Sequence, residues 1–401
     1  MAASGAPDPL RALLTPEAVR DRAERLFALA EADRLDHFRL VPERLDEAAE
    51  LVAALTRESY PDLNVPLHSR WRHLEIAGPD PWSGTGLDGE APARAQVELA
   101  IVSVLLDAGA GAGWRYRDET TGLELARSEG LAVASLRMFR AGGFSGDPRA
   151  APLRADRRGL EAVTAESLGR HFQVRGDNPL VGLEGRARLL NALGRAIPAE
   201  ARLGFIYDLL AARSRDLSGR LPAREILLVI LECFNAIWPS GLWLGRRALG
   251  DVGRHRQLKT GDASDGLVPF HKLSQWLAYS LIEPLQATGI AVGGLDGLTG
   301  LAEYRNGGLF LDTGVLRPRD PAILERPHEP DSECVVEWRA LTVALLDRLA
   351  VAVRVRLSKN AAELPLAAIL QGGSWAAGRR LAEARRGGLP PLTVASDGTV
   401  F

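Results

Sequence analysis

Apolar residues recur at helical spacing along most of the chain, three or four positions apart on one face. The strongest runs cover residues 91–108, 221–238 and 337–357, and each is long enough to predict a buried or half-buried helix. Residues 1–60 are expected to be helical throughout, with Thr15 capping a first helix that begins at Pro16 and a second helix over 41–60. Alternation typical of strands is scarce, so the pattern predicts an all-α fold.

Further helices are expected over 159–173 and 182–197. Another is expected around Lys272, with Pro269 in its first turn and Asp265 or Ser264 as its cap. Near the C-terminus, Gly372-Gly373-Ser374 is expected to open a helix that carries Trp375, Arg379 and Arg380. The backbone amides of such a helix start are suited to holding an anion.

The chain of 401 residues is long enough for one large helical body or for two average domains. We expect a single catalytic unit over 1–401 that divides into two helical lobes, residues 1–180 and residues 181–401. An active-site cleft is expected between these lobes. Internal repeats and low-complexity segments are not apparent.

Composition narrows the class of protein. Apolar residues make up 46% and charged residues 25%, and the net charge is −2, which argues against a disordered chain or a nucleic-acid coat. Cys233 and Cys334 lie far apart in apolar surroundings and predict free thiols in a reducing compartment. No secretory leader and no apolar run long enough to span a membrane is found, so a cytoplasmic protein is expected.

Cofactor motifs are not evident. The seven histidines show no paired-ligand spacing, so neither a metal nor another cofactor is expected. Residues Ala110-Gly111-Ala112-Gly113 lack the G-x-G-x-x-G spacing of a dinucleotide loop. Neither nucleic acid nor a membrane is expected as a partner.

Residues 261–312 concentrate the most unusual chemistry. Lys272, Trp276 and Tyr279 fall on one face of the predicted helix, and a glycine-rich connection then leads to Glu303. A cation and a carboxylate arranged in this way can face one pocket. The alternative reading is that Glu303 starts an ordinary exposed helix and that Lys272 is solvated.

Three other places carry candidate chemistry. In the proline- and glycine-rich segment after residue 60, Arg70-Trp71-Arg72-His73 combines guanidinium groups with an indole, which suits a phosphate or a planar ligand. The alternative, in which Trp71 fills a core and the arginines are solvated, remains open. Asp107 closes the apolar helix of residues 91–108, and a carboxylate there needs a partner or a function. Arg175 either binds phosphate or pairs with Asp177.

Several motifs carry a family resemblance: SRWRHLE, NPLVGLEGR, VPFHKLSQWLAYSLIEPL, LTGLAEYRNGGLFLDTGVL, GGSWAAGR and the terminal SDGTVF. Together they resemble the uracil-catabolism family long described as a domain of unknown function, over nearly the whole chain. The resemblance implies a role in pyrimidine degradation. It also implies a urea-like leaving group, so that the expected substrate is ribosylurea or its 5′-phosphate.

A more distant resemblance is to the queuosine-salvage N-glycoside hydrolases. His271-Lys272-Leu273-Ser274-Gln275 and Leu301-Ala302-Glu303-Tyr304-Arg305 are similar to two motifs of that family. There the lysine lies in the substrate pocket and the acidic residue is the catalytic carboxylate, so these roles are implied for Lys272 and Glu303. Glu303 stands where that family has aspartate, which adds one methylene to the side chain. The resemblance also implies an architecture like that of helical DNA glycosylases.

Hydrolysis of an N-glycosidic bond requires a carboxylate near the sugar carbon that becomes positive. Glu303 is the candidate, either by stabilising this centre and activating water or by acting as the nucleophile. The candidate substrate-binding residues fall into three groups by their chemistry. The groups expected to bind phosphate or ribose oxygens are Lys272, its neighbour His271, Arg305, Arg70 and Arg72. The residues expected to form the pocket walls are Trp71, Trp276 and Tyr304. The groups expected to bind the leaving urea or the sugar hydroxyls are Asp107 and Asp265.

Two other functions are compatible with the sequence. One is a non-catalytic sensor of a pyrimidine-derived nucleotide, which would bind without turnover. The other is an amidohydrolase that attacks the ureido group and releases ammonia, although no metal cluster or nucleophile motif favours it. The oligomeric state and the role of the terminal SDGTVF are left open.

Overall fold

The computed structural model describes residues 8–78, 85–238 and 241–395, and the terminal SDGTVF lies outside these ranges. The chain forms two compact units that are interleaved in sequence. Among the described residues, unit 1 comprises 8–68, 242–275 and 295–395, and unit 2 comprises 69–78, 85–238, 241 and 276–294. This interleaving differs from the linear lobes, 1–180 and 181–401, that were expected from the sequence.

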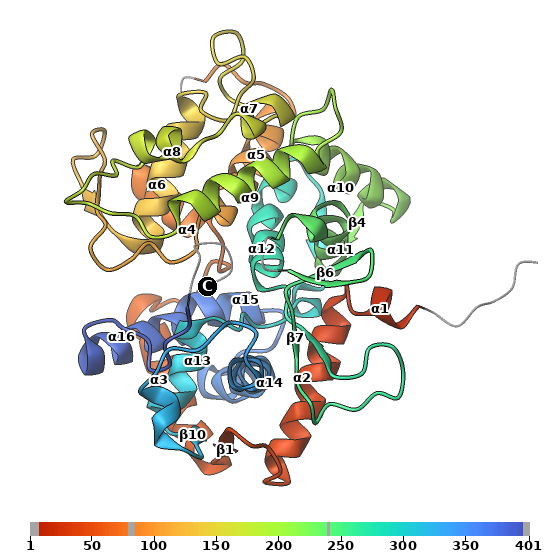
Figure 1. The fold of residues 1–401 in the computed structure, drawn as a ribbon, viewed down its shortest axis with the longest axis vertical. Helices are drawn as coiled ribbons and strands as arrows, with labels where there is room; N and C mark the ends of the chain where they lie inside the picture. The colour runs from red at the N-terminus through yellow and green to blue at the C-terminus, as the bar shows by residue number, and fades with distance from the viewer. Residues whose placement is uncertain (1–7, 79–84, 239–240, 396–401) are drawn as a thin grey trace, which may run out of the picture. The chain divides into compact units, whose positions relative to one another are not determined.

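Helices dominate both units, which confirms a mainly helical fold (Figure 1). The likeness to DNA glycosylases stays a prediction. Unit 1 contains α1 (Pro9–Ala12), α2 (Pro16–Glu31), α3 (Leu45–Ser59), α13 (Tyr304–Asp312), α14 (Glu333–Leu357), α15 (Leu366–Ile369) and α16 (Trp375–Arg386). Unit 2 contains α4 (Trp71–Leu74), α5 (Ala91–Leu105), α6 (Arg127–Arg140), α7 (Arg157–Glu161), α8 (Ala165–His171), α9 (Leu183–Ala196), α10 (Phe205–Asp216) and α11 (Ala223–Phe234). Helix α12 (Lys272–Gln286) begins in unit 1 and continues in unit 2.

The core of unit 1 forms around α14, which packs against α2 and α3 (Figure 1). Leu341, Leu345 and Leu349 of α14 are buried, as their spacing of four predicted. Helix α2 begins as expected, because Thr15 caps it by accepting a hydrogen bond from the backbone N–H of Ala18. The core of unit 2 includes α5 and α11, whose apolar residues are buried nearly all round.

The expectation that residues 1–60 are helical throughout was wrong. Strand β1 (Phe38–Leu40) separates α2 from α3 and pairs antiparallel with β10 (Leu316–Pro318). The carboxylate of Glu337 accepts hydrogen bonds from the backbone N–H groups of His37 and Phe38 at 3.2 and 2.7 Å. Partners about three hundred residues away in the chain therefore decide this local conformation.

The other strands are also short and form two-stranded sheets within the described ranges. The antiparallel pairs are β2 (Tyr116–Arg117) with β3 (Glu124–Leu125), β5 (Leu242–Leu244) with β6 (Arg247–Gly250), and β7 (Val252–Arg254) with β8 (Leu267–Pro269). The remaining pair is parallel, between β4 (Arg220–Pro222) and β9 (Ala291–Gly293), with Leu221 opposite Val292.

Two predicted helices have different bounds. The segment 159–173 forms α7 and α8 instead of one helix, because α7 ends at Glu161 and Thr164 caps α8 anew through a capping box with Ser167. Residues Leu370–Ser374 do not open a helix but form a π-helix between α15 and α16. Because α16 continues directly from this π-helix, the expected anion site at a helix start is absent there.

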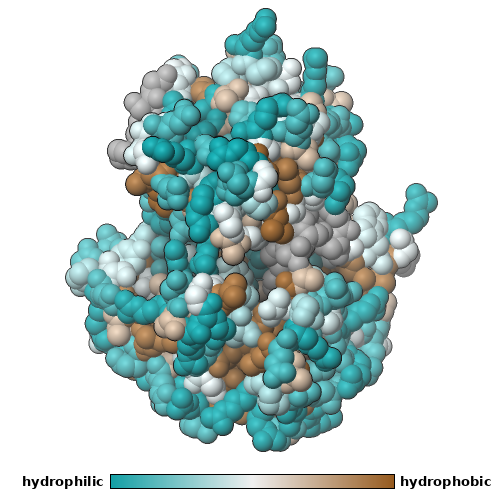
Figure 2. All heavy atoms as spheres, turned by 60° about the vertical axis from the view of Figure 1, so that its left-hand side comes forward, coloured by the Kyte–Doolittle hydropathy of each residue, from teal (hydrophilic) through white to brown (hydrophobic). Residues whose placement is uncertain are grey.

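The face of the molecule drawn in Figure 2 is mostly hydrophilic, with apolar residues in small patches. Cys233 is half-buried, Cys334 is buried, and both are free thiols, as expected. Burial raises the pKa of Cys233 to about 11 and that of Cys334 to about 12. Along the part of the chain that the structure describes, no helix combines the length and apolar character required to cross a bilayer.

Candidate functional site

Glu303 lies at the N-terminus of α13 and caps that helix. Its Oε2 accepts a hydrogen bond from the backbone N–H of Arg305 and its Oε1 from that of Asn306, both at 2.6 Å. Its backbone is extended, with φ −115° and ψ 168°. The additional methylene of glutamate is accommodated because the side chain folds back onto the first turn of the helix. Both carboxylate oxygens therefore meet donors at the positive end of the helix dipole.

The electrostatic setting of Glu303 combines opposing effects. Its side chain is half-buried, and burial raises the pKa of the carboxyl above its usual value. The two backbone hydrogen bonds lower this pKa, and so do the nearby charges of Lys272 and Arg305. The predicted cation and carboxylate of unit 1 thus interact with each other. Because the raising effect prevails, Glu303 accepts a proton more readily than an ordinary surface glutamate.

Helix α13 is fixed by buried polar contacts just after Glu303. The side chain of Asn306 donates to the carbonyl oxygen of Leu301 at 3.2 Å and accepts from the hydroxyl of Ser374 at 2.8 Å. Trp338 donates through Nε1 to the carbonyl oxygen of Gly307 at 3.1 Å. Ser374 belongs to the π-helix, a type of irregularity that is frequent at functional sites. These contacts hold the turn that positions the Glu303 carboxylate.

Lys272 is the first residue of α12, so Pro269 ends strand β8 and does not begin the helix. The predicted caps, Ser264 and Asp265, were also wrong, because they lie in the loop before β8. Ser264 donates to Asp262 at 2.6 Å and accepts from Arg22 at 2.9 Å.

Asp265 interacts with its own loop. Its carboxylate accepts from the backbone N–H of Thr260 at 2.7 Å and pairs with Lys259 at 3.4 Å. His271 is buried, and its Nε2 lies 3.0 Å from the carbonyl oxygen of Leu13. These contacts give Asp265 and His271 structural roles, and substrate contact by either residue stays a prediction.

Tyr304 and Arg305 follow Glu303 directly. The guanidinium carbon of Arg305 lies 4.6 Å from the centre of the Tyr304 ring, a distance typical of a cation–π contact. Arg305 is buried, and its Nη1 donates to the carbonyl oxygen of Gly388 at 3.3 Å. Its charge lowers the pKa of Glu303 from within the protein.

A second polar cluster lies in unit 2 around Arg70 and Asp107. The side chain of Arg70 is fully buried and its Nη1 lies 2.6 Å from Oδ1 of Asp107. Arg70 also donates to the hydroxyl of Ser103 at 2.7 Å and to the carbonyl oxygen of Ser128 at 3.1 Å. The hydroxyl of Ser128 donates to Asp107 at 3.2 Å. The partner that Asp107 was expected to need is therefore Arg70.

The other candidate residues of unit 2 are Trp276, Trp71 and Arg72. Trp276 lies under the Arg70 guanidinium, with 5.5 Å between the guanidinium carbon and the ring centre. Trp71 is buried and donates through Nε1 to the carbonyl oxygen of Ser280 at 2.8 Å. Arg72 pairs with Glu283 at 2.6 Å and with Glu75 at 2.7 Å. The described structure thus gives each of these candidates a protein partner.

Arg186 is an important residue that the sequence reasoning missed. It is fully buried and donates to the carbonyl oxygens of Leu106, Ala108, Gly109 and Val181, including a distance of 3.0 Å to Gly109. It therefore holds the loop that carries Asp107 at the C-terminal end of α5. Its signal was present in the sequence, since Arg186 lies within the NPLVGLEGR motif.

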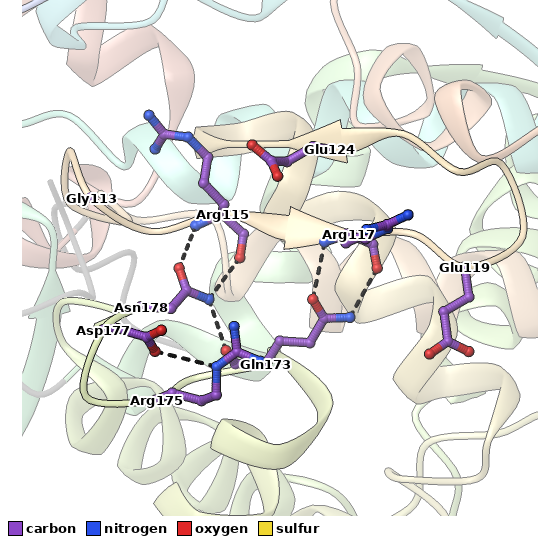
Figure 3. Close-up of a pocket in the computed structure, with 9 residues that line it drawn as sticks. All are labelled: Gly113, Arg115, Arg117, Glu119, Glu124, Gln173, Arg175, Asp177 and Asn178. Atoms are coloured by element: carbon purple, nitrogen blue, oxygen red, sulfur yellow. Dashed lines mark hydrogen bonds and ion pairs between the residues drawn. The ribbon is translucent and has the colours of Figure 1, made fainter.

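Unit 2 also contains a hollow of ≈ 670 Å³ beside the β2–β3 hairpin (Figure 3). Asn178 and Gln173 pair through their side-chain amides with the backbone of Arg115 and Arg117, and so replace a third strand. Arg175 pairs with Asp177 at 3.3 Å, which is the second of the two interactions predicted for it. The lining carries as many acidic as basic side chains: Arg115, Arg117, Arg175, Glu119, Glu124 and Asp177.

Comparison with known proteins gives consistent matches over nearly the whole chain. The family model described as "Protein of unknown function (DUF1688)" matches residues 12–401, so the chain belongs to this family. "Protein urg3" of Schizosaccharomyces pombe is 38% identical over 404 residues, covering 97% of this chain and 98% of the relative. "Uracil catabolism protein 4" of Lachancea kluyveri is 33% identical over 439 residues, covering 98% of this chain and 99% of the relative.

Proposed function

We propose that this protein acts in uracil catabolism as an N-glycoside hydrolase that releases urea from ribosylurea or its 5′-phosphate. The name of the Lachancea kluyveri relative, which matches this chain over nearly its full length, supports the pathway. The similarity of the Lys272 and Glu303 segments to the queuosine-salvage hydrolases supports the reaction class. The chemistry of the site supports the same reaction class.

The observation that carries it is the setting of the Glu303 carboxylate. Two backbone amides hold both of its oxygens, and burial raises its pKa. A carboxylate held in this way is fixed in direction and incompletely neutralised by its surroundings. It is therefore suited to stabilising a positive centre that develops only in the transition state.

The reaction breaks the bond between the sugar carbon C1′ and the ureido nitrogen. As this bond breaks, positive charge develops on C1′ and the ring oxygen, and the negative Glu303 stabilises it. Water then adds its oxygen to C1′ and gives up a proton, while the departing nitrogen takes up a proton. The products are urea and ribose, or ribose 5-phosphate. Glu303 is suited to receive the proton of the water because its pKa is raised towards the working range of a general base.

Lys272 contributes a positive charge near Glu303, as its effect on the Glu303 pKa indicates. In the proposed reaction its ammonium group binds a phosphate or ribose oxygen.

In unit 2, Arg70 retains one buried donor, since its Nη2 has no hydrogen-bond partner among the described residues. Contacts from Arg70, Arg72, Trp71, Asp107 and Trp276 to the substrate stay predictions, as do those from Tyr304 and Arg305.

The test is to incubate the purified protein with ribosylurea and with its 5′-phosphate, in separate reactions, and to measure free urea. The Glu303→Gln variant is compared with Asp320→Asn, a matched control in unit 1. Asp320 is an exposed carboxylate that also caps a helical turn, through the N–H of Ala322 at 3.0 Å. We expect urea from the wild type and from Asp320→Asn, and none above background from Glu303→Gln.

The other outcomes separate the alternatives. Urea from Glu303→Gln at more than a third of the wild-type rate would remove Glu303 from the mechanism. Release of ammonia instead of urea would support an amidohydrolase. Binding of either compound without any turnover would support a sensor. A preference for the phosphorylated substrate would indicate a phosphate site.

A further inference from the structure

Helix α12 begins in an unusual way. His271, the residue before it, has a φ of +48°, a left-handed conformation that is strained for a residue other than glycine. The backbone N–H of Lys272 is capped by the carboxylate of Asp251, 21 residues earlier, with an N to Oδ2 distance of 2.9 Å. The carbonyl oxygen of Asp251 accepts from the N–H groups of Phe270 and His271 at 2.9 and 3.2 Å. Asp251 thus holds three consecutive residues that lead to the Lys272 side chain.

Asp251 is itself fixed by Arg339 of α14. The two guanidinium nitrogens Nη1 and Nη2 lie 2.8 Å from Oδ1 and Oδ2 of Asp251, respectively. The exposed fraction is 4% for the Arg339 side chain and 11% for that of Asp251. Arg339 also covers the ring of Phe270, with its guanidinium carbon 3.9 Å from the ring centre. The charge of Arg339 and these hydrogen bonds hold the pKa of Asp251 at about 2 in spite of burial.

This arrangement is more elaborate than a helix start requires. A serine or aspartate directly before the helix would cap it without a strained backbone or a buried ion pair. Strained backbone persists only where the surroundings over-determine it, and it occurs preferentially at functional sites. The residue that emerges from this turn is Lys272, whose charge acts on Glu303.

We propose that Asp251, locked by Arg339, is a positioning residue that fixes the turn at the start of α12 and thereby directs the Lys272 side chain towards Glu303. This inference rests on the proposed function, because it assigns Lys272 to the same site. Asp251 does not contact the reacting atoms and acts through the backbone of residues 270–272. Loss of Asp251 should therefore resemble loss of Lys272 at Glu303.

The experiment measures the pKa of Glu303 directly, so that it does not depend on turnover. The full-length protein is labelled with ¹³C at the glutamate side-chain carboxyl, and the Glu303 signal is assigned by its absence in Glu303→Gln. The pH titration of this signal is then recorded for the wild type, Lys272→Met, Asp251→Asn and the double variant. The groups whose charges act on Glu303 are Lys272 and Arg305, and Arg305 is left unchanged throughout.

We expect both single variants to raise the Glu303 pKa, because both remove or displace a positive charge that lowers it. The double variant should titrate like Lys272→Met alone, since Asp251 acts only through Lys272. An unchanged Glu303 pKa in Asp251→Asn, or additive shifts in the double variant, would overturn the proposal.

Two further variants separate positioning from simple destabilisation. Arg339→Lys keeps the charge opposite Asp251 but loses the two-pronged contact. It replaces Asp251→Asn if that variant fails to fold. The Glu303 pKa should rise in Arg339→Lys, but by less than in Lys272→Met. Asp118→Asn is the matched control, because Asp118 of unit 2 is buried and binds Arg137 in the same two-pronged way at 2.8 and 2.9 Å. It should lower stability without moving the Glu303 pKa.

The measurement also distinguishes the two proposals. If the wild type releases no urea but Asp251→Asn and Lys272→Met shift the Glu303 pKa together, the proposed reaction fails and the positioning role stands. If urea is released but the Asp251 variant leaves the Glu303 pKa unchanged, the reaction stands and the positioning role fails.

Discussion

Unit 1 and unit 2 each contain a buried or half-buried carboxylate at a helix end, and the two are satisfied in different ways. Asp107 of unit 2 meets the guanidinium of Arg70 and a serine hydroxyl. Glu303 of unit 1 meets two backbone amides, with positive side chains acting on its charge. The charge of Asp107 is compensated within the fold, whereas burial makes ionisation of Glu303 costly. The contrast separates a carboxylate whose charge is paired within the fold from one that is suited to chemistry.

The largest effect is expected from Glu303→Gln on activity. Removing the charge that stabilises the transition state should lower kcat by about 10³-fold or more, because general base and electrostatic contributions commonly reach 10²–10⁴. Rates of urea release, compared at equal folded protein by circular dichroism, test this. A loss of activity accompanied by unfolding would instead assign Glu303 to structure.

The converse is expected for Arg70→Met in unit 2. Without Arg70, the buried Asp107 loses its ion-pair partner, which should lower the free energy of unfolding by about 3–5 kcal/mol. Chemical denaturation measures the loss. The double variant Arg70→Met/Asp107→Leu removes both charges and should recover much of the stability. If Arg70→Met costs less than about 1 kcal/mol, the ion pair is not what holds this part of unit 2.

A smaller effect on activity is expected from Lys272→Met. A hydrogen bond to a charged group contributes about 1.5–3 kcal/mol, so loss of a phosphate contact should raise KM for the phosphorylated substrate by about 10- to 100-fold. KM should rise more than kcat falls. An unchanged KM would mean that Lys272 binds no part of the substrate.

The pH dependence should follow the Glu303 pKa. Because burial raises this pKa above the usual value of 4.5, kcat/KM should fall with decreasing pH through an apparent pKa higher than 4.5. Lys272 lowers the same pKa, so the acidic limb of Lys272→Met should lie at higher pH than that of the wild type. A pH–rate profile of both proteins measures this shift. A shift to lower pH in the variant would contradict the assignment of the limb to Glu303.

The smallest effect concerns the capping role that Glu303 shares with Thr15. Loss of either cap should cost about 1 kcal/mol of stability, since Thr15 accepts a single hydrogen bond from Ala18 at 3.2 Å. Thermal unfolding of Thr15→Ala and Glu303→Ala tests the comparison. Only Glu303→Ala should also lose activity, and equal activities would reduce Glu303 to an ordinary cap.

The sequence predicts best what depends on neighbouring residues. The apolar periodicity located α5 and α14, and Thr15 followed by proline located the start of α2. It could not locate β1, because a strand of three residues is decided by its partner, and that partner, β10, lies far along the chain.

The same distinction applies to the candidate site. The candidate chemistry of Glu303 and Lys272 was readable from residue types and motifs. Asp251 caps the backbone N–H of Lys272 through a tertiary contact that no local pattern encodes. The same is true of the hydrogen bonds by which Arg186 fixes the loop that carries Asp107.

The interleaving of unit 1 has a consequence for synthesis on the ribosome. Helices α2 and α3 are made first, yet their partner α14 comes much later, as the pairing of Arg20 with Asp347 across 327 residues illustrates. At a translation rate of about 5–20 residues per second, the apolar faces of α2 and α3 wait for roughly tens of seconds. Meanwhile residues 69–241 of unit 2 emerge as one continuous stretch. The nascent chain therefore presents unpaired amphipathic helices during elongation, and we expect it to depend on chaperones more than a protein of similar size whose contacts are local.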